Sequence, residues 1–69
     1  MKRRAVLIKI KQAAESQGLV YSVESLTRHD AVRVGQTCRT IGRHSQIDEI
    51  TARKFFAQFE NELGNRWWR

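Results

Sequence analysis

The sequence predicts a two-layer α+β domain in which an N-terminal helix, three antiparallel strands and a C-terminal helix follow one another. Apolar residues recur at helical spacing near both ends, β-branched residues gather in the middle, and glycines separate these segments. The 69 residues show no repeat or linker, so we expect residues 1–69 to form a single domain. A domain this small buries only about 60% of the surface its unfolded chain exposes, so its stability is marginal unless a partner adds to it.

The first helix is expected over residues 3–17. Its apolar face consists of Val6, Leu7, Ile10, Ala13 and Ala14. Gly18 follows at the position where a residue in the left-handed conformation commonly ends a helix.

Three strands are expected over residues 19–26, 29–34 and 37–41. Between the last two, Gly35 and Gln36 form a two-residue loop suited to a type II′ hairpin turn. Because side chains alternate along a strand, the middle strand divides into two faces. One face carries His29, Ala31 and Arg33, and the other carries Asp30, Val32 and Val34.

The last helix is expected from Asp48 or Glu49 to Leu63, with Asp48 accepting hydrogen bonds from the first free amides. Its buried stripe consists of Ala52, Phe55, Phe56, Phe59 and Leu63. Beyond Gly64, Trp67 and Trp68 are expected to fold back over the core or to contact a protein partner, rather than to stack on RNA bases.

Three antiparallel strands with two helices on one face leave the other sheet face open. Double-stranded RNA-binding domains share this order of elements, although a fold does not by itself decide function.

The charge of the chain favours a polyanionic partner. Thirteen Lys and Arg against seven Asp and Glu leave a formal net charge of +6 at pH 7. Each phosphate that a cation neutralises releases condensed counterions, so this excess favours RNA binding. The alternative is that the charge only keeps the chain in solution.

One cysteine and two histidines restrict the metal and redox chemistry of the chain. Cys38 has no partner for an internal disulfide, and with only His29 and His44 beside it there is no structural zinc site. We therefore expect no metal, no cofactor and a reducing, cytoplasmic location. The apolar run at residues 5–8 ends at Lys9, so it is too short for a signal peptide or a membrane span.

Four short segments, in their order and spacing, carry a family resemblance. These segments are residues 29–35 (HDAVRVG), 41–47 (IGRHSQI), 49–53 (EITAR) and 62–69 (ELGNRWWR). With the Arg3-Arg4 opening of the first helix and the α-β-β-β-α order, they resemble the HicA toxins. The first segment resembles the family's His-x-x-x-Arg-x-Gly strand and turn, and the second its apolar-Pro-Arg-His-x-Glu-Ile segment, with Gly42 in place of proline. The tail is similar to that of actinobacterial members.

The resemblance implies a metal-independent endoribonuclease that cleaves mRNA and inhibits translation, as the toxin of a type II toxin–antitoxin system. It also implies a HicB-type antitoxin as partner, with a monomer alone and a hetero-oligomer in the complex. Family members rely on the histidine that begins the second strand, which is His29 in this sequence. Leu26, Thr27 and Arg28 replace the family's glycine-rich approach to that histidine.

Histidine suits RNA cleavage because an imidazole ordinarily titrates near pH 6.5 and can accept or donate a proton near neutrality. As the general acid–base residue, His29 would deprotonate a ribose 2′-hydroxyl, whose oxygen then attacks the adjacent phosphorus. Arg28, Arg33 or Arg39 would stabilise the charge that develops on the phosphoryl oxygens. Because Arg33 shares a strand face with His29, we expect both side chains to converge on one phosphate.

Arg43, His44 and Lys9 complete the expected RNA-binding residues. His44 precedes the last helix, where a phosphate contact and a hydrogen bond to the helix cap are both open interpretations. Lys9 belongs either to a solvated helix face or to a stripe that follows the RNA backbone. Asp30 faces away from His29, so we do not expect it to orient the imidazole.

Two other functions fit the same residues. On the strand pattern alone, His29 is better explained as an ordinary hydrogen-bonded residue, which would make the domain a non-catalytic module for double-stranded or structured RNA. The other possibility is a protein–protein adaptor whose basic face meets an acidic partner. The resemblance favours the ribonuclease.

Overall fold

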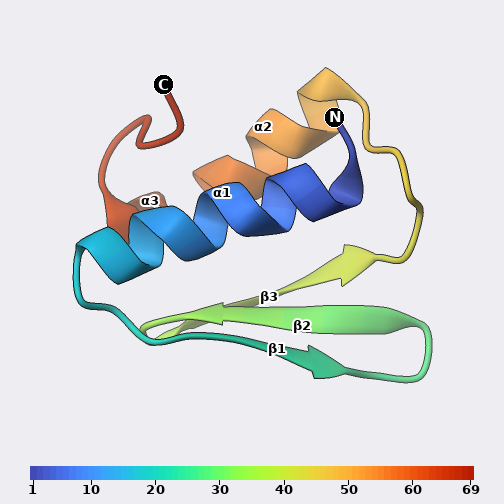
Figure 1. Ribbon diagram of the computed structural model, residues 1–69, viewed down its shortest axis with the longest axis horizontal. Helices are drawn as coiled ribbons and strands as arrows, with labels where there is room; N and C mark the ends of the chain where they lie inside the picture. The colour runs from blue at the N-terminus through green and yellow to red at the C-terminus, as the bar shows by residue number, and fades with distance from the viewer.

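The computed structural model describes residues 1–69, and its elements follow the predicted α-β-β-β-α order (Figure 1). They are α1 (Arg3–Ser16), β1 (Tyr21–Ser25), β2 (His29–Val34), β3 (Thr37–Gly42), α2 (Glu49–Ala57) and α3 (Glu60–Leu63). The predicted α+β class is confirmed, and each strand ends within two residues of its predicted bounds.

The strands form one antiparallel sheet in the order β1-β2-β3. In its register Tyr21 pairs with Val34, and His29 pairs with Gly42. At the β2–β3 turn Gly35 has a φ of +58°, whereas the residue after it does not have a positive φ. One positive φ at the first turn residue is the pattern of the predicted type II′ turn.

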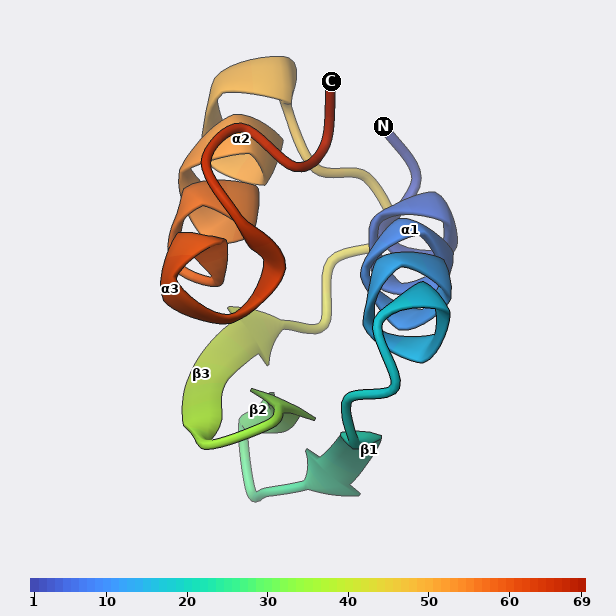
Figure 2. The same ribbon diagram turned by 90° about the vertical axis from the view of Figure 1, so that its left-hand side faces the viewer.

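The helices lie together on one face of the sheet and leave the other face bare (Figure 1). Figure 2 shows α1 above β1, with α2 and α3 beside it above β3. The predicted division of β2 is confirmed, because Val32 and Val34 are fully buried while His29 and Arg33 are exposed. His29 therefore lies on the bare face.

The core fills the space between the two layers. Its buried residues are Val6, Ile10, Ala14, Val32, Val34, Ile41, Ala52, Phe55, Phe56, Phe59 and Leu63. Phe55 and Phe59 meet edge to face, with ring centroids 5.3 Å apart. The predicted apolar stripes of both helices thus supply most of the core.

Helix α1 ends one residue before its predicted end, in a Schellman motif. Gly18 has a φ of +71°, the Leu19 N–H donates to Ala14 O at 2.9 Å, and the Gly18 N–H donates to Glu15 O at 3.1 Å. With 14 residues α1 is the longest helix, and neither it nor any other has the length and hydropathy needed to cross a membrane.

The prediction of one continuous helix up to Leu63 is wrong, because the helix breaks at residues 58–59. In an uninterrupted helix Phe56 O would accept a hydrogen bond from residue 60. Here it accepts from the Phe59 N–H at 3.1 Å and from Trp67 Nε1 at 2.8 Å. The Trp67 indole thus donates to the carbonyl oxygen that would accept the next hydrogen bond of a continuous helix. The predicted apolar stripe of the last helix stays buried on both sides of the break.

The C-terminal tail folds back over the core, as predicted. The ring centroids of Trp67 and Trp68 lie 5.1 Å and 6.1 Å from that of Phe56, and both indoles are half-buried. The indoles therefore extend the small core instead of standing free for base stacking.

Asp48 caps α2, as predicted. Its Oδ1 accepts a hydrogen bond from the Thr51 hydroxyl at 2.6 Å, and its Oδ2 accepts one from the Thr51 N–H at 3.1 Å. These hydrogen bonds lower the pKa of the Asp48 carboxyl, with the hydroxyl contributing most.

We expect Trp67→Ala to lower the free energy of unfolding by about 2–4 kcal/mol, because it removes both the ring packing and the indole hydrogen bond. Trp67→Phe keeps a ring but loses the donor, and should cost about 1 kcal/mol. Urea unfolding measures both, with Arg69→Ala as a surface control. A Trp67→Ala variant as stable as the control would show that the tail does not support the core.

We also expect the stabilising effect of Asp48 to depend on pH. Because its pKa is lowered in the folded protein, the contribution is complete above the ordinary aspartate value near 3.9 and is lost as the pH falls through the lowered value. The urea midpoint of Asp48→Ala should lie below that of the wild type at pH 7, and the two should approach each other as the pH falls below about 3.9. Asp48→Asn keeps an acceptor oxygen but does not titrate, so its difference from Asp48→Ala should not change with pH. A wild-type advantage over Asp48→Ala that persists unchanged at pH 2 would contradict this account.

Candidate functional site

His29 begins β2 at the end of the sheet where the β1–β2 turn and the end of β3 meet. The residue is exposed, and its imidazole makes no hydrogen bond or ion pair within the protein. Its partner across the sheet is Gly42, which has no side chain to crowd the ring. The interpretation of His29 as a hydrogen-bonded structural residue therefore has no contact to support it.

Asp30 lies on the opposite, helix-facing side of β2, where its side chain is only 15% exposed. Arg3 Nη2 donates to its Oδ2, and Arg43 Nε donates to its Oδ1 at 3.1 Å. A carboxylate removed from water is costly unless it is paired and hydrogen-bonded. We call Arg3, Asp30 and Arg43 the carboxylate clamp; it does not touch the His29 ring, as predicted for Asp30.

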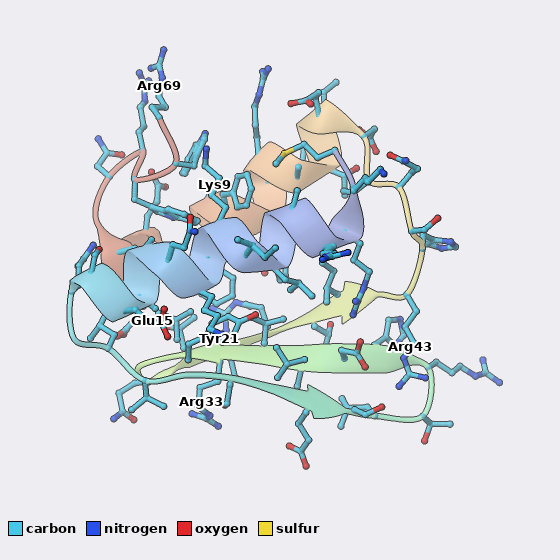
Figure 3. The ribbon with its side chains drawn as sticks, viewed as in Figure 1. Lys9, Glu15, Tyr21, Arg33, Arg43 and Arg69 are labelled. Atoms are coloured by element: carbon cyan, nitrogen blue, oxygen red, sulfur yellow. The ribbon has the colours of Figure 1, made fainter.

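Arg43 fastens the β1–β2 turn to the clamp (Figure 3). Its Nη2 donates to Ser25 Oγ at 2.8 Å, to Leu26 O, and to His29 O at 3.2 Å. Arg43 Nε and Nη2 thus have acceptors within the protein, whereas Nη1 makes no hydrogen bond there and the side chain is 44% exposed. The structure shows Arg43 holding the turn before His29, and its predicted RNA contact stays a prediction.

Arg3 links the start of α1 to the segment that follows β3. Its Nε donates to Gly42 O at 2.9 Å, and its backbone N–H donates to Ser45 O at 2.9 Å. Tyr21 is influenced by the same guanidinium: burial raises the pKa of the Tyr21 phenol, and the positive charge of Arg3 partly opposes that rise.

The clamp was not predicted from the sequence, although one signal for it was present. Asp30 alternates with Val32 and Val34, so the pattern itself places a carboxylate on a buried strand face. Such a group requires a cation. The pattern could not say which of thirteen Lys and Arg residues would supply it.

His44 is brought to the same end of the sheet as His29. Its Cδ2 lies 3.5 Å from the position that a Cβ on Gly42 would occupy, and the imidazole is exposed and makes no hydrogen bond within the protein. Since Cβ atoms of paired residues on one sheet face are about 4.5–5.5 Å apart, His44 Cδ2 lies at most about 9 Å from His29 Cβ. The helix-cap interpretation of His44 is wrong, because Thr51 provides the hydrogen bonds to the Asp48 cap.

Arg28 and Arg33 are both exposed and unpaired, but only Arg28 adjoins His29. Arg28 precedes it directly at the β1–β2 turn. Arg33 lies on the bare face (Figure 3), four residues along β2, which corresponds to about 13 Å in an extended strand. Arg33 and His29 thus share the bare face but are not neighbours, and the expectation that they converge on one phosphate stays a prediction.

Arg39 and Lys9 do not join the site. Arg39 pairs with the buried Val32 and so belongs to the helix-facing side, where its Nη1 donates to Cys38 O at 2.8 Å. Lys9 lies on α1, on the side of the helix away from the sheet (Figure 3). Both lie on the far side of the sheet from His29.

A groove of about 410 Å³ runs between β3 and α2, and both His44 and Gly42 line it. Its polar lining includes Thr40, His44, Asp48, Thr51 and Lys54. The Asp48 carboxylate accepts the hydrogen bonds of the helix cap. Lys54 is therefore the charged side chain of the groove that has no ion-pair partner. Lys54 was not predicted as a site residue, because an exposed lysine on a helix has no distinguishing sequence pattern.

No cluster of three or more His, Cys, Asp or Glu side chains is positioned to hold a metal ion. Comparisons of the chain with protein-family models, with curated proteins and with solved structures find no match. The similarity to HicA toxins thus stays a prediction from the motifs.

We expect Asp30→Asn to lower the free energy of unfolding by about 1–3 kcal/mol, because two guanidinium groups lose their charged partner in a largely buried place. Urea unfolding measures the loss, and faster amide hydrogen exchange at Leu26 should accompany it as the turn loosens. Glu24→Gln removes an exposed carboxylate from β1 and should change stability by less than about 0.5 kcal/mol. Equal effects of the two substitutions would mean that the clamp contributes no more than an exposed charge.

Proposed function

We propose that this protein is a metal-independent endoribonuclease that cleaves mRNA and inhibits translation, acting as the toxin of a HicA-like toxin–antitoxin system in the cytoplasm. The observation that carries the proposal is the exposed, unbonded imidazole of His29 at the end of a bare sheet face, on a backbone fastened by the carboxylate clamp. A catalytic group needs such support, because misplacement by about 1 Å can cost about 100-fold in rate.

The reaction that suits this site is transesterification. His29 takes the proton of a ribose 2′-hydroxyl, the 2′-oxygen attacks phosphorus, and a 2′,3′-cyclic phosphate forms as the bond to the 5′-oxygen breaks. The exposed guanidinium of Arg28, adjacent in sequence, stabilises the charge on the phosphoryl oxygens.

The charge distribution supports RNA as the substrate. The net charge is +6, while the clamp uses two arginines for one carboxylate. Arg28, Arg33 and Lys54 remain without an ion pair around the bare face and the adjoining groove. Such cations bind phosphates and make RNA affinity fall steeply with salt.

The partner expected from the resemblance is a HicB-type antitoxin that binds the monomeric toxin in a hetero-oligomer. A small domain gains stability from any partner that binds only its folded form.

We expect His29→Ala to reduce cleavage of a labelled mRNA fragment by at least about 100-fold, because a general acid–base residue contributes about 100- to 10,000-fold. Wild-type products should end in a 2′,3′-cyclic phosphate, and RNA binding by the variant should stay near the wild-type level. Induction of the wild type, but not of His29→Ala, should arrest growth.

The matched control is Gln36→Ala, which changes an exposed residue at the opposite end of the sheet and should leave cleavage unchanged. If clean wild-type protein binds RNA without cutting it, the domain is an RNA-binding module instead. If binding depends only weakly on salt, the protein–protein adaptor is the better description.

A further inference from the structure

The two histidines of the chain flank one backbone position that has no side chain. His29 pairs with Gly42 from the β2 side. His44 packs over the same glycine and lines the groove on the other side of β3. Gly42 therefore forms a floor without a side chain of its own beside two exposed imidazoles.

An in-line displacement at phosphorus needs two proton-transfer groups on opposite sides. The attacking oxygen loses a proton, and the leaving oxygen, roughly opposite it, must gain one. Each group must come within about 3 Å of its oxygen. With His44 Cδ2 at most about 9 Å from His29 Cβ, a phosphate above Gly42 lies within reach of both rings.

We propose that His44 is the second catalytic residue of this site, a general acid that protonates the leaving 5′-oxygen; the proposal rests on the ribonuclease activity proposed above. His29 accepts the 2′-hydroxyl proton as the bond from the 2′-oxygen to phosphorus forms. The bond from phosphorus to the 5′-oxygen breaks, and that oxygen takes the proton of the His44 imidazolium. Proton exchange with water then restores both rings.

The groove supports this division of roles. The leaving oxygen belongs to the nucleotide on the 3′ side of the cut, so the nucleotide must lie on the His44 side of Gly42. The groove between β3 and α2 opens there. Lys54 in its wall is placed to bind the next phosphate of that nucleotide.

The decisive experiment compares two forms of one RNA that the wild type cleaves, with oxygen or with sulfur at the bridging 5′ position of the scissile linkage. A thiolate leaves without being protonated. We expect His44→Ala to lower cleavage of the oxygen RNA at least about 100-fold, yet to cleave the sulfur RNA within about tenfold of the wild type. His29→Ala, which lacks the base, should be impaired on both.

The possible outcomes separate the two proposals. Wild-type protein that cuts neither RNA overturns the ribonuclease itself. If the wild type cuts RNA and His44→Ala is fully active, His44 is not the general acid. The same holds if His44→Ala loses activity equally on both RNAs. In both cases the ribonuclease proposal stands. Ser45→Ala, an exposed neighbour, is the matched control, and circular dichroism verifies the fold of each variant.

A pair of substitutions at Gly42 tests the geometry without removing either histidine. Gly42→Ala adds only a Cβ, which meets His44 Cδ2 at 3.5 Å, an ordinary contact. Gly42→Val suits a strand but adds two methyl groups beyond that Cβ, so it should reduce cleavage of both RNAs at least about tenfold, and by more than Gly42→Ala does. Full activity of a folded Gly42→Val variant would show that the phosphate does not lie between the imidazoles.

Discussion

The ion pairs of Asp30 with Arg3 and Arg43 are the interaction on which the candidate site depends. The three residues come from β2, from the first turn of α1 and from the segment after β3. Through Arg43 the carboxylate holds the β1–β2 turn, and through Arg3 it holds the carbonyl of Gly42. One carboxylate therefore fixes the two backbone segments that carry His29 and His44. The Arg3 and Asp30 side chains are only 21% and 15% exposed, so their ion pair is less weakened by salt than a surface pair would be, whereas the Arg43 side chain is 44% exposed.

The order of the elements and the two faces of β2 could be predicted from the sequence because both depend on local periodicity. Alternation alone placed His29 on the opposite face from Asp30. The β2–β3 turn was predictable for the same reason, since the positive φ of Gly35 depends only on the conformational freedom of that residue. These features need no knowledge of residues far away in the chain.

The features that could not be predicted involve contacts between distant residues. Ala52, Phe55, Phe56, Phe59 and Leu63 keep the same spacing whether the helix is whole or broken. The break depends on an indole that returns from eleven residues beyond Phe56. Likewise, Arg33 was placed on the correct face, but the face alone did not reveal its distance from His29. The position of His44 follows from the path of the chain after β3, which has no periodic signal.

The core has a consequence for the timing of folding during synthesis. The helix-facing side of the sheet is covered by residues as late in the chain as Phe59 and Leu63, and the last of the aromatic cover is Trp68. Until residues 59–68 have left the ribosome, a nascent chain has three strands and one helix but too little apolar cover to hold them together. The sheet therefore gains a stable core only after synthesis has passed Trp68, and a chain truncated within α2 would expose its strands to aggregation.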